Sequence, residues 1–324
     1  MTNLIFPEDG TVVSQKTDVM RLFERDIRKN AWVWRWGMFA CDQDGVLTRP
    51  VPICFKWETD DKDAVFALAY DPDFTEPVPH KVSGNTAEAV NLLLGRKYYW
   101  KVGNSEVRSF FTEDKPPRWI YTERAANVRD IGGYVTPGGR RVRQGMIYRG
   151  TMIFEEGDPE GLRTLHDDLG IALELDLRAP DEAEGRNSSL IGDDVKYIRI
   201  ESESYSEFLE WGFNIPKYFE ILADPSNYPM YIHCMIGADR TGTLVAVILS
   251  LIGLDPEQVM REYELSTVAF PNDHRSRDEI GWKEFEKTLG VFGKNFTERI
   301  RNFVISNGAT EEQIEKLREI MLEP

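Results

Sequence analysis

The sequence is poor in the features that mark secreted and membrane-spanning proteins. Its 324 residues include three cysteines, Cys41, Cys54 and Cys234, which are too few for a disulfide framework. The longest apolar run, Leu244 to Leu254, is much shorter than the ~20 residues that cross a bilayer as a helix. Residues 1–10 have neither a basic start nor an apolar core, so we expect no secretory signal. These absences predict a cytoplasmic protein that does not insert into membranes.

Positive charge is also scarce. The chain has 39 lysines and arginines against 55 aspartates and glutamates, and its net charge is −16. A surface of that sign repels the nucleic-acid backbone and anionic membranes, so neither is an expected partner. It also repels an anionic substrate at long range, so any phosphate site must be positive locally. The hydrophobic content of 41% is ordinary for a globular protein and allows a large core.

Two patterns of apolar residues divide the chain. Short alternating or apolar segments between about residues 31 and 111 predict a β-sandwich. After the polar, proline-containing linker 113–118, apolar strands alternate with helical patterns, which predicts an α/β fold with a sheet between helices. We therefore expect two domains, 1–118 and 119–324, and leave the structure of the first 30 or so residues open. The segments that carry the β prediction are 51–57, 64–70, 97–102 and 107–112.

Helix starts are marked by capping residues at several places. Asp158 and Asp255 each precede a proline, which predicts an N-cap followed by proline at the first helical position. Thr310 and Gln313 have the spacing of a capping box. Near the N-terminus, residues 17–28 place apolar side chains on one face and predict a short helix.

The most informative stretch is Tyr231 to Thr243, which reads YIHCMIGADRTGT. Apolar runs on both sides predict a loop between a buried strand and a buried helix. At such a helix start, unpaired amides and the helix dipole favour an anion, and the same field favours the thiolate form of Cys234. Gly237 and Gly242 allow the backbone to close tightly. Arg240 offers a planar fork for two phosphate oxygens.

A thiolate at the floor of a phosphate cradle suits cysteinyl-phosphate chemistry. We predict that Cys234 is the nucleophile and that Arg240 holds the phosphate. Thr241 either donates its hydroxyl to the thiolate or caps the helix, and His233 fixes the loop through the backbone. An inert buried cysteine at a strand end is the alternative, which the full set of residues disfavours. The predicted phosphate-binding residues are Met235, Ile236, Gly237, Ala238, Asp239 and Arg240.

The pattern His-Cys-x-x-Gly-x-x-Arg-Thr-Gly at 233–242 resembles the signature loop of the protein tyrosine phosphatase superfamily. Three further motifs resemble one branch, the bacterial atypical tyrosine phosphatases, some of which also cleave phosphoinositides. They are Asn-x-Arg-Asp-x-Gly-Gly at 127–133, Tyr-Arg at 148–149 and Asp-Leu-Arg at 176–178. The resemblance implies a cysteine-dependent phosphatase that uses neither a metal nor a cofactor.

A second resemblance concerns the first domain. Residues Asn91 to Val102, with their leucines followed by Tyr-Tyr-Trp, resemble the penultimate-strand region of fibronectin type III-like domains. The resemblance implies a sandwich that either binds a partner or packs on the enzyme as a scaffold. The sequence leaves both roles open, because a fold does not determine a function.

The leaving group needs an acid, and the sequence offers several candidates. Asp239 is the first choice, because the resembling branch has aspartate at this place; its alternative role is to pair with an arginine. Asp176 is the second choice and follows a strand, where such sheets present ligand contacts; its alternative is an ion pair with an arginine. Glu201 and Glu203 occupy the place where most of the superfamily carries its mobile acid loop, or they form a solvated loop.

Several arginines are expected to support the site. Arg129 and Asp130 are predicted to pair with each other and brace the sheet edge. Arg178 and Arg149 either form similar pairs or reach the substrate, and Arg178 or Arg129 would be the partner of Asp176. A polar loop adds basic residues that either contact an anionic substrate or are simply exposed: His274, Arg275 and Arg277.

The loop composition also suggests a substrate. Lipid-active relatives carry lysine where this chain has Ala238, so the loop itself supplies only Arg240 as a cation. Tyr205, Trp211 and Phe213 are available for an apolar rim that would favour an aryl phosphate. We therefore predict a protein-tyrosine phosphatase or an enzyme for small phosphomonoesters. The alternatives are a phosphoinositide or inositol phosphate phosphatase and, from another class, a phosphate-binding pseudophosphatase or adaptor.

Overall fold

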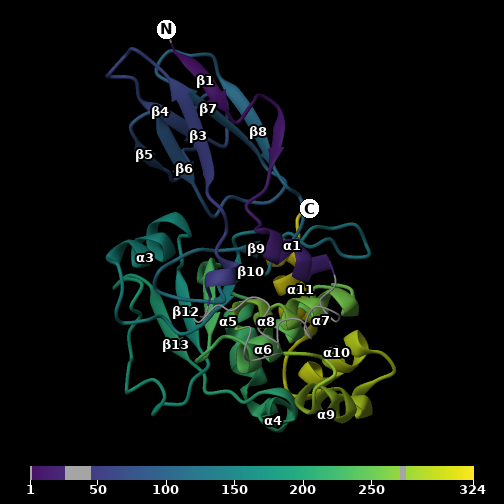
Figure 1. Ribbon diagram of the computed structural model, residues 1–324. Coiled ribbons are helices and arrows are strands. Elements are labelled where there is room, and N and C mark those ends of the chain that lie inside the picture. The colour runs from purple at the N-terminus through teal and green to yellow at the C-terminus, as the bar shows by residue number, and fades with distance from the viewer. Residues whose placement is uncertain (1, 26–44, 271–274) are drawn as a thin grey trace.

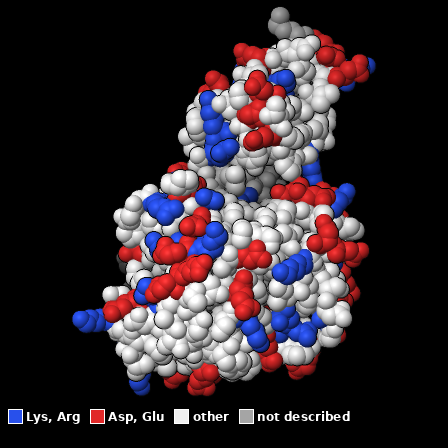
Figure 2. Space-filling model, turned by 180° about the vertical axis from the view of Figure 1, so that it is seen from behind, with Lys and Arg blue, Asp and Glu red and all other residues white. Residues whose placement is uncertain are grey.

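The computed structural model describes residues 2–25, 45–270 and 275–324. Strands form two separate groups along the chain, an N-terminal region of residues 2–112 and a C-terminal region of residues 118–324. Figure 1 shows the N-terminal strands stacked above the helix-rich C-terminal region. On the face seen in Figure 2, acidic and basic side chains are interspersed over both regions, so the negative charge is not gathered in one patch there.

The N-terminal region consists of two four-stranded sheets. Their strands are β1 (Asn3–Phe6), β2 (Thr11–Val13), β3 (Ile53–Glu58), β4 (Phe66–Ala69), β5 (Lys81–Ser83), β6 (Thr86–Ala89), β7 (Lys97–Val102) and β8 (Arg108–Thr112). One sheet has the order β1-β3-β6-β5 and the other β2-β8-β7-β4. The pair β2 and β8 is parallel, and the other pairs described in these sheets are antiparallel. Each of the four segments predicted to be extended contains a strand.

Alternation along the strands builds the core between these two sheets. Every second residue of β7 is buried, because successive side chains of a strand point to opposite faces. Phe55 of β3 lies at the centre of the core. Its ring centroid is 5.0 Å from that of Phe66, 5.3 Å from Trp100 and 5.6 Å from Phe110.

The C-terminal region is built on one six-stranded sheet. Its strands are β9 (Arg118–Trp119), β10 (Arg129–Asp130), β11 (Ile147–Gly150), β12 (Leu173–Asp176), β13 (Lys196–Arg199) and β14 (Met230–His233). The order is β13-β12-β14-β11-β10-β9, with β11 to β14 parallel and β9 and β10 antiparallel. All four residues of β14 are buried, as expected for a parallel strand covered on both faces. The predicted α/β fold is therefore confirmed for this region.

Helices cover this sheet. They are α3 (Pro159–Arg163), α4 (Tyr205–Glu210), α5 (Ile215–Leu222), α6 (Asp239–Leu251), α7 (Pro256–Glu264), α8 (Ser266–Ala269), α9 (Ile280–Leu289), α10 (Phe296–Ser306) and α11 (Glu311–Met321), with α1 (Asp18–Arg25) preceding them in the chain. The predicted caps Asp158, Asp255 and Thr310 each accept a backbone N–H, and Thr310 forms the expected capping box with Gln313. Among the described residues, none of the helices is long and apolar enough to cross a membrane.

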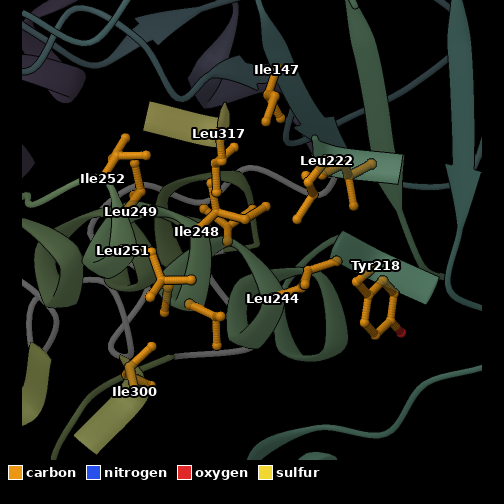
Figure 3. Packing of buried hydrophobic residues seen from close by; sticks show 14 of the residues in the cluster. Ile147, Tyr218, Leu222, Leu244, Ile248, Leu249, Leu251, Ile252, Ile300 and Leu317 are labelled. Atoms are coloured by element: carbon orange, nitrogen blue, oxygen red, sulfur yellow. The ribbon is translucent and has the colours of Figure 1, made fainter. Parts of the chain in front are cut away.

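The helix α6 is the centre of the C-terminal core. Its residues from Thr241 to Leu251 are all buried. Figure 3 shows Leu244, Ile248 and Leu251 of this helix among side chains from the sheet, from α5 and from the C-terminal helices. A helix that is apolar on every side must be enclosed, so the start of α6 is held firmly in place.

The two regions are joined by specific hydrogen bonds. Arg118, at the end of the predicted linker, is buried in β9 and donates to the carbonyls of Asn91 and Leu92. The amide side chain of Gln144 bonds both the N–H and the carbonyl of Leu94, at 2.8 and 2.9 Å. Of the two roles expected for the N-terminal region, packing on the C-terminal region is therefore observed.

Candidate active site

The loop of residues 234–238 lies at the centre of the sheet, between the end of β14 at His233 and the start of α6 at Asp239. The predicted strand, loop and helix are confirmed. Cys234 follows the strand directly and is 2% exposed. Ala238 is the N-cap of α6, which places Arg240 in the first helical turn, where free backbone amides favour an anion.

The carbonyl groups of residues 234–238 all accept hydrogen bonds from groups outside the loop, that of Cys234 from the ring of His233. The N–H of Met152 donates to the carbonyl of residue 235 at 3.0 Å. The side chain of Asn127 donates to the carbonyls of residues 236 and 237, both at 3.3 Å, and Arg149 donates to those of residues 237 and 238. Within the described residues, the amides of 235–238 donate to no protein acceptor. They are thus available to an anion.

Glycines at 237 and 242 are required by space, and Gly237 by its conformation as well. Gly237 has a φ of +67°, and a Cβ there would overlap the carbonyl oxygen of Gly150. A Cβ at Gly242 would lie 2.9 Å from the ring of Tyr263. The loop can therefore lie against β11 and α7 only without side chains at these two positions.

A buried ionic network supports the loop from behind. Glu262 accepts hydrogen bonds from both Arg129 and Arg149, each at 2.7 Å. Burial alone would raise the pKa of Glu262, but the two guanidinium groups outweigh it and lower that pKa. Arg129 also donates to the carbonyl and the side chain of Asn127, which connects the network to the loop. Glu262 was not identified from the sequence, because it lies far along the chain from its partners.

The predicted pair between Arg129 and Asp130 is wrong. Arg129 binds Glu262, whereas Asp130 binds Arg118 at 2.9 Å. The two residues are neighbours in β10, and successive side chains of a strand point to opposite faces, so they cannot meet. Both nevertheless support the site region: Asp130 also accepts the amides of 132 and 145.

Arg240 carries a partner that the sequence did not indicate. Its two terminal nitrogens donate to the carboxylate of Glu182, at 2.5 and 2.8 Å. This bonding raises the pKa of Arg240 and lowers that of Glu182. Glu182 lies in the loop that follows β12, at the edge of the sheet where the cysteine loop also lies. The sequence signal that could have identified Glu182 is its place shortly after a predicted strand, because sheets of this kind present ligand contacts beyond their strand ends.

Asp176, the second candidate for the acid, is enclosed in an ion pair. Arg178 donates to both of its oxygens, and the hydroxyl of Tyr197 donates at 2.8 Å. Burial acts to raise the pKa of Asp176, but these bonds and the nearby His233 lower it to about 2. The side chain is 0% exposed. The pairing alternative is confirmed with Arg178 as the partner, and Arg129 is not involved.

Asp239, the first candidate, is more accessible. Its side chain is 28% exposed and lies at the first position of α6. Arg275 donates to both of its oxygens, at 2.6 and 2.9 Å, and the hydroxyl of Tyr205 donates to one of them. The hydroxyl of Tyr205 is also hydrogen-bonded to that of Tyr263. Asp239 thus has the arginine partner that was expected as an alternative, and it borders the loop.

His233 and Thr241 lie close to Cys234 in the sequence, and the structure shows the surroundings of both side chains. His233 is buried between the carbonyl of Cys234 and the carboxylate of Glu174, at 3.0 and 2.9 Å, so its role in fixing the loop is supported. The capping role of Thr241 is wrong, because Ala238 is the N-cap. Its buried hydroxyl has no hydrogen-bond partner within the part of the chain that the structure describes.

The candidates in loops are placed as follows. Glu201 is exposed and Glu203 is half-buried near the charge of Arg240. Arg277 is bound to Glu264 and Glu257, and His274 lies outside the described residues. In the described ranges, the histidine, cysteine and acidic side chains form no cluster of three that could hold a metal ion.

The C-terminal region is similar in sequence to a known protein family. Residues 120–323 match the sequence profile described as the tyrosine phosphatase family. A Cupriavidus necator protein provisionally named a tyrosine-protein phosphatase is 27% identical over 43% of this chain and 59% of its own length. A tyrosine-protein phosphatase of Nostoc commune is 26% identical over 34% of this chain and 45% of its own length. The matches thus span about half the length of these relatives.

Part of this chain can also be aligned with a solved structure. It is the core catalytic domain of the PP-IP phosphatase SIW14 from S. cerevisiae, in complex with citrate. Its sequence is 21% identical, and the alignment covers 52% of this chain and 86% of that one with a TM-score of 0.33.

Proposed function

The chain belongs to the tyrosine phosphatase family, and from this premise we propose that it hydrolyses phosphate monoesters through a cysteinyl-phosphate intermediate. The observation that carries the proposal is the loop of residues 234–238. Its carbonyls all accept hydrogen bonds from outside the loop, so its amides, Cys234 and the donors of Arg240 that Glu182 does not use can surround one tetrahedral anion.

The reaction has two steps. The thiolate of Cys234 attacks phosphorus, so that a sulfur–phosphorus bond forms while the bond to the leaving oxygen breaks. Water then attacks the phosphocysteine and releases inorganic phosphate and the thiolate. In both steps the loop amides and Arg240 stabilise the equatorial oxygens. Glu182 takes two of the five N–H donors of Arg240, which fixes the fork and leaves the other donors for the substrate.

We propose Asp239 as the general acid. Asp176 is buried, fully hydrogen-bonded and has a pKa of about 2, so it carries no proton to donate near neutral pH. Asp239 is partly exposed beside Arg240. Arg275 pairs with both oxygens of Asp239, and a bound phosphate dianion would compete for that arginine. The competition would free the carboxyl group of Asp239 to act as the proton donor to the leaving oxygen.

The charges around the loop support a substrate with a single phosphate. Each of three arginines near it is paired with a carboxylate: Arg240 with Glu182, Arg275 with Asp239, and Arg178 with Asp176. With these charges balanced, the loop amides and the start of α6 remain the main positive potential. That potential suits one phosphate group, whereas a polyphosphorylated inositol would need additional free cations.

We propose phosphotyrosine, or a small aryl phosphomonoester, as the substrate. The N–H of Tyr205 donates to the side chain of Thr243, so the start of α4 lies beside the first turns of α6. Tyr205 is thus available at the rim. Trp211 and Phe213 contact each other beyond the far end of α4, and we assign them no role in binding.

The test is phosphate release in EDTA from a phosphotyrosine peptide, nitrophenyl phosphate and a panel of phosphoinositides. Turnover that disappears in Cys234→Ser would support the cysteinyl mechanism. Asp239→Asn should lower kcat by about 100-fold on the peptide and less on nitrophenyl phosphate, whose leaving group needs little protonation. A preference for phosphoinositides would overturn the substrate, and phosphate binding without any turnover would favour an adaptor.

We also propose that the N-terminal region is a fibronectin III-like or immunoglobulin-like sandwich, with the domain boundary at residues 118 and 119. The two strand orders, the parallel pairing of β2 with β8 and the buried Tyr98 and Trp100 of the penultimate strand support this assignment. A cytoplasmic location remains a prediction from the sequence.

A further inference from the structure

Two pieces of the N-terminal region leave its sheets between β2 and β3 and lie against the C-terminal region. They are α1 (Asp18–Arg25) and the short turn of Gly45–Thr48, which together we call the arm. Figure 1 shows α1 below the two sheets, next to the helices of the C-terminal region. Contacts of the arm include α8 and Ala126, which lies in the segment that leads to β10.

The arm is fixed to α8 by apolar packing. Met20 and Phe23 of α1 are each 1% exposed and share a cluster with Trp119, Leu265 and Val268. Burial of this extent is what gives a helix–helix contact its stability. The arm therefore supplies one side of the cluster in which α8 begins.

The turn of the arm makes a second, closer contact. The N–H of Gly45 donates to the carbonyl of Ala269, the last residue of α8, at 2.9 Å. Gly45 has a φ of +77°, and a Cβ there would lie 2.7 Å from the Cβ of Ala126. The turn thus touches α8 and also the residue that precedes Asn127.

The helix α8 depends on such outside support. It has four residues, and one helical turn is not stable by its own hydrogen bonds. Its first residue, Ser266, is 0% exposed and accepts hydrogen bonds from Asn127 and Arg129, both at 3.2 Å. The position of the Ser266 hydroxyl is therefore set by what holds α8, and the arm is part of that.

Asn127 transmits this position to the phosphate loop. The same side-chain nitrogen that donates to Ser266 donates to the carbonyls of Ile236 and Gly237. Asn127 also has a φ of +55°, a conformation that is uncommon for a non-glycine residue and persists where its surroundings enforce it. Loosening α8 would remove one of these restraints and allow the loop carbonyls to turn toward the anion.

We infer that the arm is a positioning element of the phosphate loop, so that the N-terminal region takes part in catalysis. Through α8, Ser266 and Asn127 it keeps the loop carbonyls turned away and the amides free for the anion. This inference rests on the proposed function for its kinetic consequence, but the oxyanion site that it concerns can be measured without any turnover.

The test compares Phe23→Ala with Gln144→Ala in the full-length chain. Gln144 also joins the two regions, through two hydrogen bonds to Leu94, but it contacts neither α8 nor the loop. The readouts are the Kd for sodium tungstate, a tetrahedral oxyanion, and kcat/KM on nitrophenyl phosphate, both corrected for the folded fraction. Phe23→Ala should raise the Kd and lower kcat/KM about tenfold, and Gln144→Ala should change neither more than about twofold.

Two further variants complete the design. Phe23→Leu should retain most of the wild-type tungstate affinity, because leucine fills much of the space that alanine would leave empty in the cluster. If Phe23→Ala does not fold, Gly45→Ala provides the same test, since its Cβ would push on Ala126 and shift Asn127.

The outcomes separate the two proposals. A folded Phe23→Ala with wild-type tungstate affinity would overturn the role of the arm, as would equal losses in Gln144→Ala. A wild-type protein that binds tungstate but hydrolyses none of the substrates would contradict the proposed function alone. The tungstate Kd of Phe23→Ala would still test the role of the arm, because that measurement needs no turnover.

Discussion

The core between the N-terminal sheets and the network behind the phosphate loop bury different kinds of side chain. Between the N-terminal sheets the core is apolar, with Phe55, Trp100 and Phe110 in edge-on contact. Behind the phosphate loop, the C-terminal region instead buries Arg129, Arg149 and Glu262, all of which are at most 2% exposed.

Apolar burial and buried ion pairs have different physical consequences. Apolar burial stabilises a fold but has little directional preference, so it can hold a module together without specifying one atom's position. A buried ion pair adds little net stability, because desolvation offsets the attraction. Its hydrogen bonds have fixed directions, however, and here they end on the carbonyls of the phosphate loop. The C-terminal network is therefore better explained by positioning than by stability.

The largest effect should come from breaking this network with Glu262→Gln. The change leaves two buried guanidinium groups facing a neutral side chain, so unfolding free energy should fall by about 3–5 kcal/mol and turnover should be lost with it. Urea unfolding and assays on the folded fraction measure both. Glu257→Gln, on the same helix but exposed, is the control and should cost less than about 1 kcal/mol. Full activity in a folded Glu262→Gln would contradict the positioning role.

A comparable loss of stability without a loss of function is expected from Phe55→Ala. Deleting this 0% exposed ring should cost about 3–5 kcal/mol in the N-terminal region, because a cavity remains. Turnover per folded molecule should stay within about twofold, since the ring contacts other rings of the same core. Phe111→Ala, whose ring is exposed on β8, is the matched control for stability. If Phe55→Ala reduced kcat as strongly as Glu262→Gln, the contrast between the two cores would be wrong.

A smaller effect, mainly on function, should follow from Gly237→Ala. Its Cβ would collide with the carbonyl of Gly150 and displace the loop, so we expect about 100-fold lower kcat/KM and weaker tungstate binding. Gly170→Ala provides the control: it has a similar φ of +63° but open space around it. Both variants should lose some stability from backbone strain, and Gly237→Ala should lose more because of the collision. Only the first should lose activity; equal activities would show that the close approach is unimportant.

The smallest expected effect concerns acid stability. The pKa of Asp176 is lowered to about 2 in the folded protein, so its ion pair contributes stability at pH values above its unfolded pKa of about 3.9. That contribution, about 2–3 kcal/mol, should be lost as the pH falls from about 4 toward 2. Asp176→Asn should lack this part of the pH dependence in urea unfolding between pH 5 and 2.5. An identical acid loss in the variant would show that other carboxylates are responsible.

Several features of the fold and site could be predicted from the sequence. The strand, loop and helix around Cys234 follow from apolar runs on either side of a short polar segment. The caps Asp158, Asp255 and Thr310 act locally, within their own helical turn, so the residue type is sufficient to locate them. At these places the signal is local, and prediction and structure agree.

Predictions about partners were less successful. Arg129 and Asp130 are adjacent in the chain, but the strand directs them to opposite sides, toward Glu262 and Arg118. Asp176 and Asp239 are both candidate acids in the sequence, each with an arginine as its alternative partner. The structure encloses the first with Arg178 and leaves the second partly exposed at a helix start. Such differences depend on the order of strands in the sheet, which no single segment specifies.

The sequence by itself determined the chemistry of this protein. A cysteine, an arginine and two glycines at fixed spacing need only a strand and a helix around them to form an anion site, and hydrophobic periodicity supplies both. Only the tertiary structure decided what holds that site. Glu182, Glu262, Ser266 and the arm come from distant parts of the chain and meet the loop because the sheet order and the packing of the N-terminal region bring them there. Hydrogen bonds and ion pairs act over a few ångströms, so the residues that position the loop are defined by where the chain folds back rather than by their place along it.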